Sequence, residues 1–283
     1  MITIDGGHRV WTKKVGDAPV KVLLLHGGPG ADHQYFECFE DFLPHNGIEF
    51  YYYDQLDSTN SDKPGDDRLW TIARFRDEVE QVRRGLGLED FYLYGQSWGG
   101  MLAIEYALQY QEHLAGLVIS NMTASTPSYE KHIAELRAKL PTGVIAKLDK
   151  YEMAGQYDAP EYLQVLFGEV YQRHFCRLNP WPEPLERGFR NLNQKIYNYM
   201  WGPSEFTVSG TLKDWDRWQD LPRIQVRTLV MGARYDTMDE RDIRREGSLI
   251  PNSSVFIGEK GSHLALYDDQ RPYTEALIRF LKA

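Results

Sequence analysis

Short apolar runs alternate with amphipathic stretches along most of the chain. The run at residues 21–26 is typical of a strand buried on both faces of a sheet. Further strands are predicted over residues 48–54, 91–94, 114–120, 226–232 and 254–257. Apolar positions at helical spacing predict helices over residues 71–86, 98–110, 240–249 and 270–281. This alternation indicates an α/β fold with a mostly parallel central sheet and helices on both faces.

The pattern changes at the N-terminus and in the middle of the chain. Residues 2–15 alternate loosely, which predicts an antiparallel hairpin at a sheet edge. From 122 to 213 no similar strand occurs, and helix-forming, aromatic-rich segments lie near 133–140, 162–175 and 189–199. We interpret residues 122–213 as a helical cap inserted into a core made of residues 1–121 and 214–283. Most cap aromatics are expected to form the cap's own core, and others, such as Tyr157, Phe167 or Trp201, to line a side-chain pocket together with Trp98.

Composition narrows the class of protein. A chain of 283 residues fits one α/β domain with an insertion, and 42% hydrophobic residues suffice for a sizeable core. The net charge of −9 argues against nucleic acid or an anionic membrane as a partner. The two cysteines, Cys38 and Cys176, form no disulfide framework and no zinc motif. Neither a signal peptide nor an apolar stretch of about 20 residues is found, so we expect a cytoplasmic protein.

The sequence Gly95-Gln-Ser97-Trp-Gly99 matches the G-x-S-x-G nucleophile elbow. Such an elbow is a sharp turn between a strand and a helix, and it exposes a serine hydroxyl above the sheet. A bare match also describes an ordinary glycine-rich turn. Here a Phe/Tyr/Leu strand precedes the turn and apolar residues at helical spacing follow it, which favours Ser97 as a nucleophile.

A serine hydroxyl needs a base to take its proton, and imidazole is the usual base at neutral pH. In α/β-hydrolases the nucleophile, the acid and the histidine follow one another along the chain. His263 alone lies after the late strands, although it could also be a solvent-facing loop residue. Asp236 ends a predicted parallel strand and is our candidate acid, whereas Asp239 and Asp242 are expected to cap or start the next helix.

An oxyanion hole requires two backbone N–H groups fixed on the developing charge. One is expected from Trp98, directly after the nucleophile, and the other from the loop after the early strand. That loop is His26-Gly-Gly-Pro-Gly30, in which Gly28 is the candidate, because a side chain there would block the acyl carbon. His26 itself is expected to be structural.

These motifs resemble the prolyl aminopeptidase (proline iminopeptidase) family of α/β-hydrolases, which includes the tricorn-interacting aminopeptidase. The resemblance covers almost the whole chain. It rests on six segments: residues 26–30, 53–55, 95–100, 202–206, 210–215 and 235–236. It implies an α/β-hydrolase fold, and it implies that Glu205 in Trp-Gly-Pro-Ser-Glu-Phe binds the substrate's free α-ammonium group.

Two departures from the family pattern bear on the substrate. Many members carry a second glutamate after the triad aspartate, where this chain has Thr237. The usual D-Q-x-G-x-G-x-S loop reads Asp54-Gln-Leu-Asp57-Ser-Thr59-Asn-Ser61, so both glycines are replaced. A strict preference for proline is therefore less secure than exo-acting cleavage of N-terminal residues.

We therefore expect a serine aminopeptidase that removes proline or other small or hydrophobic residues from short peptides or amino-acid amides. No metal or cofactor is expected, and the oligomeric state stays open, with a monomer compatible with the sequence. A carboxylesterase or lactonase on the same scaffold is the nearest alternative. A non-catalytic binding protein is a further one, but such proteins typically lose a triad member, and this chain keeps all three.

Overall fold

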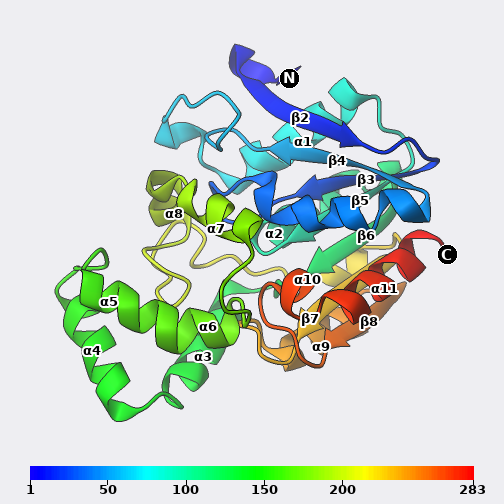
Figure 1. The fold of residues 1–283 in the computed structure, drawn as a ribbon. Coiled ribbons are helices and arrows are strands. Elements are labelled where there is room, and N and C mark those ends of the chain that lie inside the picture. Colours follow the sequence, from blue (N-terminus) through cyan, green and yellow to red (C-terminus); the bar gives the residue numbers. More distant parts are fainter.

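The computed structural model describes residues 1–283 and contains one eight-stranded sheet in the order β1-β2-β4-β3-β5-β6-β7-β8 (Figure 1). The pairs β1·β2 and β2·β4 are antiparallel, and every other neighbouring pair is parallel. The strands are β1 (Ile2–Thr3), β2 (Arg9–Val15), β3 (Val20–Leu25), β4 (Ile48–Asp54), β5 (Phe91–Gln96), β6 (Leu114–Ser120), β7 (Thr228–Ala233) and β8 (Ser253–Gly258).

Eleven α-helices accompany the sheet, together with short 3-10 turns and one π-helical segment, η6 (Leu166–Tyr171). They are α1 (Ile72–Leu86), α2 (Trp98–Tyr110), α3 (Thr126–Arg137), α4 (Thr142–Met153), α5 (Pro160–Val165), α6 (Gln172–His174), α7 (Glu183–Arg190), α8 (Gln194–Met200), α9 (Glu240–Leu249), α10 (Ala265–Asp268) and α11 (Gln270–Leu281). The helices predicted over 240–249 and 270–281 match α9 and α11, and the predicted N-terminal hairpin is present as β1 and β2.

Both faces of the sheet are buried, which explains the uninterrupted apolar runs in the sequence. Successive side chains of a strand point to opposite faces, so Leu23 and Leu25 of β3 enter one hydrophobic cluster and Val22 and Leu24 enter another. The first cluster includes α1, α2 and α9. The second includes the 3-10 segment η2 (His33–Asp41) and α11. The result is a three-layer α/β architecture, as predicted.

Helices α3 to α8 occupy the chain between β6 and β7 and stand to one side of the sheet (Figure 1). Two details differ from the sequence interpretation. Helix α4 was not expected, and the segment near 189–199 is not one helix, because residues 191–193 separate α7 from α8 and Asn193 caps α8 with its side chain. The cap boundaries at 122 and 213 stay a prediction.

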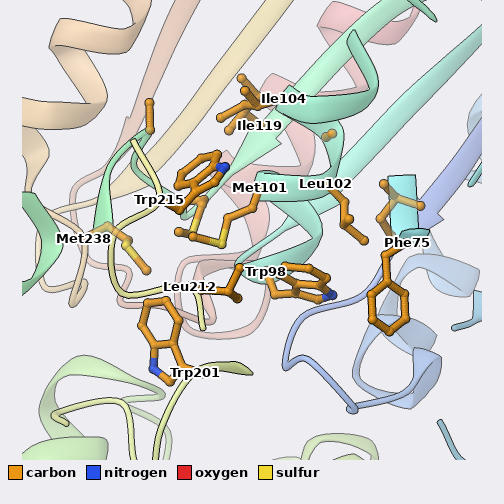
Figure 2. Close-up of a cluster of buried hydrophobic side chains, with 14 of the residues drawn as sticks. Phe75, Trp98, Met101, Leu102, Ile104, Ile119, Trp201, Leu212, Trp215 and Met238 are labelled. Carbon is orange, nitrogen blue, oxygen red and sulfur yellow. The ribbon is translucent and has the colours of Figure 1, made fainter. Parts of the chain in front are cut away.

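A buried cluster joins the end of this helical segment to the core. Trp201, Leu212 and Trp215 belong to one buried cluster with Trp98 and Met101 of α2 (Figure 2). Trp215 also donates its indole N–H to Glu105 of α2 at 2.7 Å. These contacts fix the helical segment over the N-terminus of α2, which is where Ser97 lies. No helix of the structure is both long and apolar enough to cross a bilayer.

Candidate active site

Ser97 lies at the turn between β5 and α2, at the carboxyl edge of the sheet. Its backbone adopts φ 56° and ψ −128°, a sparsely populated conformation for a residue with a side chain. A Cβ on Gly95 would overlap the backbone of Gly99, so the turn requires glycine there. The Ser97 amide donates to Ser120 of β6 at 3.0 Å, which ties the turn to the neighbouring strand. The local geometry is that of a nucleophile elbow.

Asp236 and His263 meet at the same edge, because each follows a parallel strand there: Asp236 follows β7 and His263 follows β8. Their side chains are 0% and 2% exposed, and His263 Nδ1 lies 2.8 Å from Asp236 Oδ1. With Nδ1 engaged by the carboxylate, Nε2 remains to accept a proton. His263 and Ser97 line one cavity.

The protonation of His263 is set by opposing effects. Burial alone would lower its pKa, but the charge of Asp236 and the hydrogen bond to it act in the other direction, with smaller contributions from Glu205 and Asp268. The balance raises the pKa of His263 above 6.5. The structure thus favours the imidazolium form that arises when the histidine accepts a proton.

Asn121 is a further site residue, which sequence reasoning did not assign. Its Nδ2 donates to Asp236 Oδ2 at 2.7 Å and to the Ser262 carbonyl at 3.2 Å. The Met238 amide donates to Asp236 Oδ1 at 3.1 Å. Asn121 follows β6 at the carboxyl edge of the sheet, and this position along the chain was the signal that could have identified it as a site residue.

The backbone N–H of Gly28 has no acceptor within the chain, and that of Trp98 lies at the first position of α2, where the helix itself supplies no acceptor. The neighbouring Gly27 amide differs, because it donates to the Tyr35 hydroxyl at 2.7 Å. Gly28 has φ 111°, and a Cβ there would lie 2.7 Å from the amide nitrogen of Ala31. Both candidate amides are therefore available for an oxyanion, and glycine is required to keep the Gly28 backbone in this conformation.

The residues around the site hold its loops together. His26 accepts the Gln55 amide N–H on Nε2 at 3.1 Å, and burial lowers the pKa of His26. Gln55 Oε1 accepts the Trp98 indole N–H at 2.8 Å, and Gln96 Nε2 donates to the His263 carbonyl at 3.1 Å. His26 and Gln55 thus connect the glycine loop to the serine turn, which agrees with a structural role for His26.

A cavity of about 580 Å³ lies between the core and the helical segment. Gly28, Ser97 and His263 line it from the core side, and residues of α5, η6, α7 and α8 line it from the other. Such a volume is typical of a small-molecule site. The cavity is where the hydroxyl of Ser97 can meet a substrate.

Glu205 lines this cavity and is 9% exposed. Its Oε1 accepts the Tyr197 hydroxyl at 2.7 Å, and its backbone carbonyl accepts the Tyr129 hydroxyl at 2.6 Å. Its amide donates to the Tyr171 hydroxyl at 3.3 Å. No Lys, Arg or His side chain forms an ion pair with it. Glu205 is therefore a nearly buried carboxylate without a counter-ion, and it lines the same cavity as Ser97 and His263.

The sequence suggested four aromatics for the side-chain pocket. Tyr157 and Phe167 do line the cavity. Trp98 and Trp201 do not, because both side chains lie in the buried cluster of Figure 2, where Trp98 packs edge-on against Phe75. Only the backbone of Trp98 faces the candidate oxyanion site.

The altered loop keeps its shape by local hydrogen bonds. Asp57 stands where the family pattern has a glycine, and it adopts φ 67°. Its carboxylate accepts the Trp70 indole N–H at 2.8 Å and the Gly65 amide at 2.9 Å. The Thr59 hydroxyl donates to Asp32 at 2.7 Å. Neither Asp57 nor Thr59 lines the cavity, so the loop does not shape the pocket directly.

Thr237, at the position of the family's second glutamate, is fully buried and does not line the cavity. Its hydroxyl donates to Asp236 at 3.3 Å. Glu205 and Asp158 are the carboxylates that line the cavity. An ammonium group bound beside Ser97 would therefore be met by Glu205 alone among the buried acids.

One cluster away from the cavity, His132, Glu135 and Asp239, has donor atoms close enough for a metal ion. Arg241 already bridges the two carboxylates, 2.7 Å from Glu135 and 2.5 Å from Asp239. Asp239 also caps α9, as predicted, by accepting the Arg241 amide at 2.8 Å. The cluster is thus an ion-pair network that holds α3 against α9.

Known proteins share this architecture. The family model described as alpha/beta hydrolase fold matches residues 21–270. A proline iminopeptidase of Flavobacterium johnsoniae is 45% identical over 280 residues, which cover 98% of this chain and 94% of that protein. The crystal structure of VinJ superposes with a TM-score of 0.95 at 34% identity, covering 100% and 97% of the two chains. A proline iminopeptidase from Mycobacterium smegmatis gives 0.90 at 31% identity, with coverage of 100% and 97%.

Proposed function

The chain belongs to the α/β-hydrolase family, in its proline iminopeptidase group, and we propose that it is a serine aminopeptidase of unblocked peptides and amino-acid amides. It releases the N-terminal residue, proline or another small or hydrophobic amino acid, through an acyl-enzyme. Its partner is a small substrate with a free N-terminus. Ser97, Asp236 and His263 form the proposed triad.

The observation that carries this proposal is the isolated carboxylate of Glu205. A nearly buried charge without a counter-ion is costly, and a cationic ligand removes that cost by pairing with it. Glu205 lines the same cavity as Ser97 and His263. An α-ammonium group bound there would present the first carbonyl to Ser97. An esterase or lactonase would have no use for such an anchor.

The proposed reaction follows from the positions of the groups. Ser97 Oγ attacks the first carbonyl carbon and passes its proton to His263 Nε2, while Asp236 stabilises the imidazolium. The Gly28 and Trp98 N–H groups donate to the oxyanion. The C–N bond then breaks, and the leaving amine takes the proton from His263. Water attacks the ester with His263 as base, which releases the amino acid and restores the serine hydroxyl.

The direct test compares proline, alanine and leucine p-nitroanilides with their N-acetylated forms. We expect rapid p-nitroaniline release from the free amines and a loss of kcat/KM of about a hundredfold or more on acetylation, because the cation is removed. Equal rates on blocked and free substrates would contradict the anchor. A fluorophosphonate should label Ser97 in the folded protein but not the Ser97→Ala variant. Absence of an adduct would favour the non-catalytic binding protein.

A further inference from the structure

His263 is held by the core and by the helical segment together. On the core side, Asp236 Oδ1 lies 2.8 Å from His263 Nδ1, and Gln96 Nε2 donates to the His263 carbonyl at 3.1 Å. On the other side, the His263 amide donates to the carbonyl of His174, at the end of α6, at 3.0 Å. The Phe175 ring packs against the imidazole, with ring centroids 5.4 Å apart and an interplanar angle of 33°. The helical segment thus contacts both the backbone and the ring of the proposed base.

The residues around Phe175 also hold the loop after β8, which carries the proposed base. The Phe175 carbonyl accepts the Leu264 amide at 2.8 Å and the Ser262 hydroxyl at 2.9 Å. Two residues later, Arg177 donates a guanidinium N–H to the Lys260 carbonyl at 2.8 Å. These hydrogen bonds join the chain between β6 and β7 to the loop after β8, so a shift of that loop would break them.

Phe175 directly follows the helix that lines much of the cavity. Residues 160–174 form one continuous helix, in which the π-helical segment η6 separates α5 from α6. Such π-helical turns occur frequently at functional sites. Tyr171, at the end of η6, accepts the Glu205 amide N–H on its hydroxyl at 3.3 Å, and its ring lies 5.4 Å from that of Phe175. The end of this helix therefore contacts both the proposed anchor and the proposed base.

A hydrogen bond on Nδ1 does not by itself fix the plane of an imidazole, because the ring can still tilt about that bond. The serine proton must arrive at Nε2, and the direction of Nε2 follows from the ring plane. An aromatic ring packed on the imidazole restricts this tilt. Its π face carries partial negative charge, which also favours the imidazolium that forms in the proposed reaction.

We infer that Phe175 is a positioning residue for the proposed base: it holds the His263 imidazole in the orientation that proton transfer from Ser97 requires. This inference rests on the proposed function. Phe175 takes no part in making or breaking a bond and acts through His263. The helical segment then contributes to the acyl transfer itself as well as to the walls of the cavity.

The first test replaces Phe175 by leucine, which fills much of the same space without an aromatic face. We expect kcat for proline p-nitroanilide to fall about tenfold to a hundredfold, with a smaller change in KM, because Nε2 is less well aligned. Phe175→Tyr keeps the ring and should hold kcat within about threefold of the wild type. An unchanged kcat in the leucine variant, or an equal loss in both variants, would overturn the inference. Phe175→Met is measured in the same way if the leucine variant does not fold.

Phe167→Leu is the matched control. Phe167 lies two turns earlier on the same helix and lines the same cavity, and its ring contacts are with Tyr171, Trp181 and Phe189. None of these is a proposed catalytic residue. The two leucine variants should lose similar thermal stability, but Phe167→Leu should change KM more than kcat. An equal fall of kcat in both would indicate a general loosening of the helical segment and would contradict a specific role of Phe175.

Labelling by a small fluorophosphonate separates this inference from the proposed function, because the reagent has no amine and does not need Glu205. Ser97 Oγ displaces fluoride from phosphorus while His263 takes the serine proton. Labelling of Phe175→Leu should be at least about tenfold slower than that of the wild type and of Phe175→Tyr. If the nitroanilide is cleaved and all three label equally fast, the inference is overturned and the aminopeptidase stands. If the wild type is labelled but does not cleave the nitroanilide, the aminopeptidase proposal fails and the labelling rates decide the inference.

Discussion

At the scale of single residues, the two buried carboxylates of the site differ in their hydrogen-bond partners. Asp236 has His263 and Asn121, whereas Glu205 has only hydroxyl donors. The charges of both carboxylates raise the pKa of His263, as does that of Asp268. The proposed binding anchor and the proposed base are therefore electrostatically coupled.

The pH profile should reveal this coupling. His263 must be neutral to accept the serine proton, so activity should rise as the pH passes its raised pKa, which places the acid limb of kcat/KM above pH 6.5. Glu205→Gln removes one negative charge, so it should shift this limb to lower pH as well as raise KM about tenfold to a hundredfold. An unmoved limb in the variant would show that the two groups are independent.

Asn121 should act as a positioning residue. Asn121→Ala removes the donor to Asp236 Oδ2, which leaves one carboxylate oxygen unpaired in a buried place. We expect kcat to fall about tenfold or more with little change in KM, and the acid limb of the pH profile to move upward because the carboxylate charge is less stabilised by hydrogen bonding. A rise in KM at constant kcat would instead indicate a role in substrate binding.

At the scale of elements, helix α9 has an ordinary N-terminal cap but a buried glutamate in its last turn. Asp239 caps its N-terminus, but Glu246 in its last turn is fully buried and has neither an ion pair nor a hydrogen bond to another side chain. Burial and the nearby charge of Asp242 raise the pKa of Glu246 well above its ordinary value. The carboxyl group is therefore expected to be neutral in the folded protein.

Glu246 makes stability depend on pH. The folded state holds the Glu246 proton more tightly than the unfolded state does. The stabilisation that results is fully present below the unfolded pKa of about 4.3 and is lost as pH rises through the raised folded pKa. Glu246→Gln cannot titrate and should flatten this decline in Tm between pH 5 and 9. Glu246→Met should flatten it and also raise the free energy of unfolding by about 1–3 kcal/mol, because it removes the buried carboxyl group. A steep decline of Tm with pH in both variants would assign the pH dependence to other groups.

At the scale of the whole molecule, the helices between β6 and β7 complete a cavity that the sheet domain lines from one side only. The buried cluster of Figure 2 holds them in register with α2, so the geometry of the site depends on residues far from the reacting groups. Stability and substrate binding should therefore change together when this cluster is disturbed.

Leu212→Ala tests this dependence. Leu212 is buried in the cluster, so the substitution should lower the free energy of unfolding by about 2–5 kcal/mol and raise KM, as the helical segment loosens over the cavity. The matched control is Leu178→Ala, in which a partly exposed leucine is removed, and it should cost far less. Thermal unfolding and steady-state kinetics give both readouts, and a large loss of stability with unchanged KM would contradict the coupling.

The sequence by itself determined the local elements and the order of the chemistry. Period-2 and period-3.6 patterns and turn residues act over short distances, so β3, α9 and the turn at Ser97 could be predicted from neighbouring residues. The chain order of Ser97, Asp236 and His263 followed from where the strands end, because parallel strands bring their carboxyl ends to one edge.

Only the tertiary structure decided what surrounds those residues. The support of Asp236 by Asn121, the ring of tyrosines around Glu205, and the absence of lysine and arginine from the cavity join segments distant in sequence. The burial of the Trp98 and Trp201 side chains in the hydrophobic cluster, away from the cavity, also depends on contacts between distant segments. Such contacts depend on how helices pack, and a side chain's own residue type does not state whether it faces the cavity or the core.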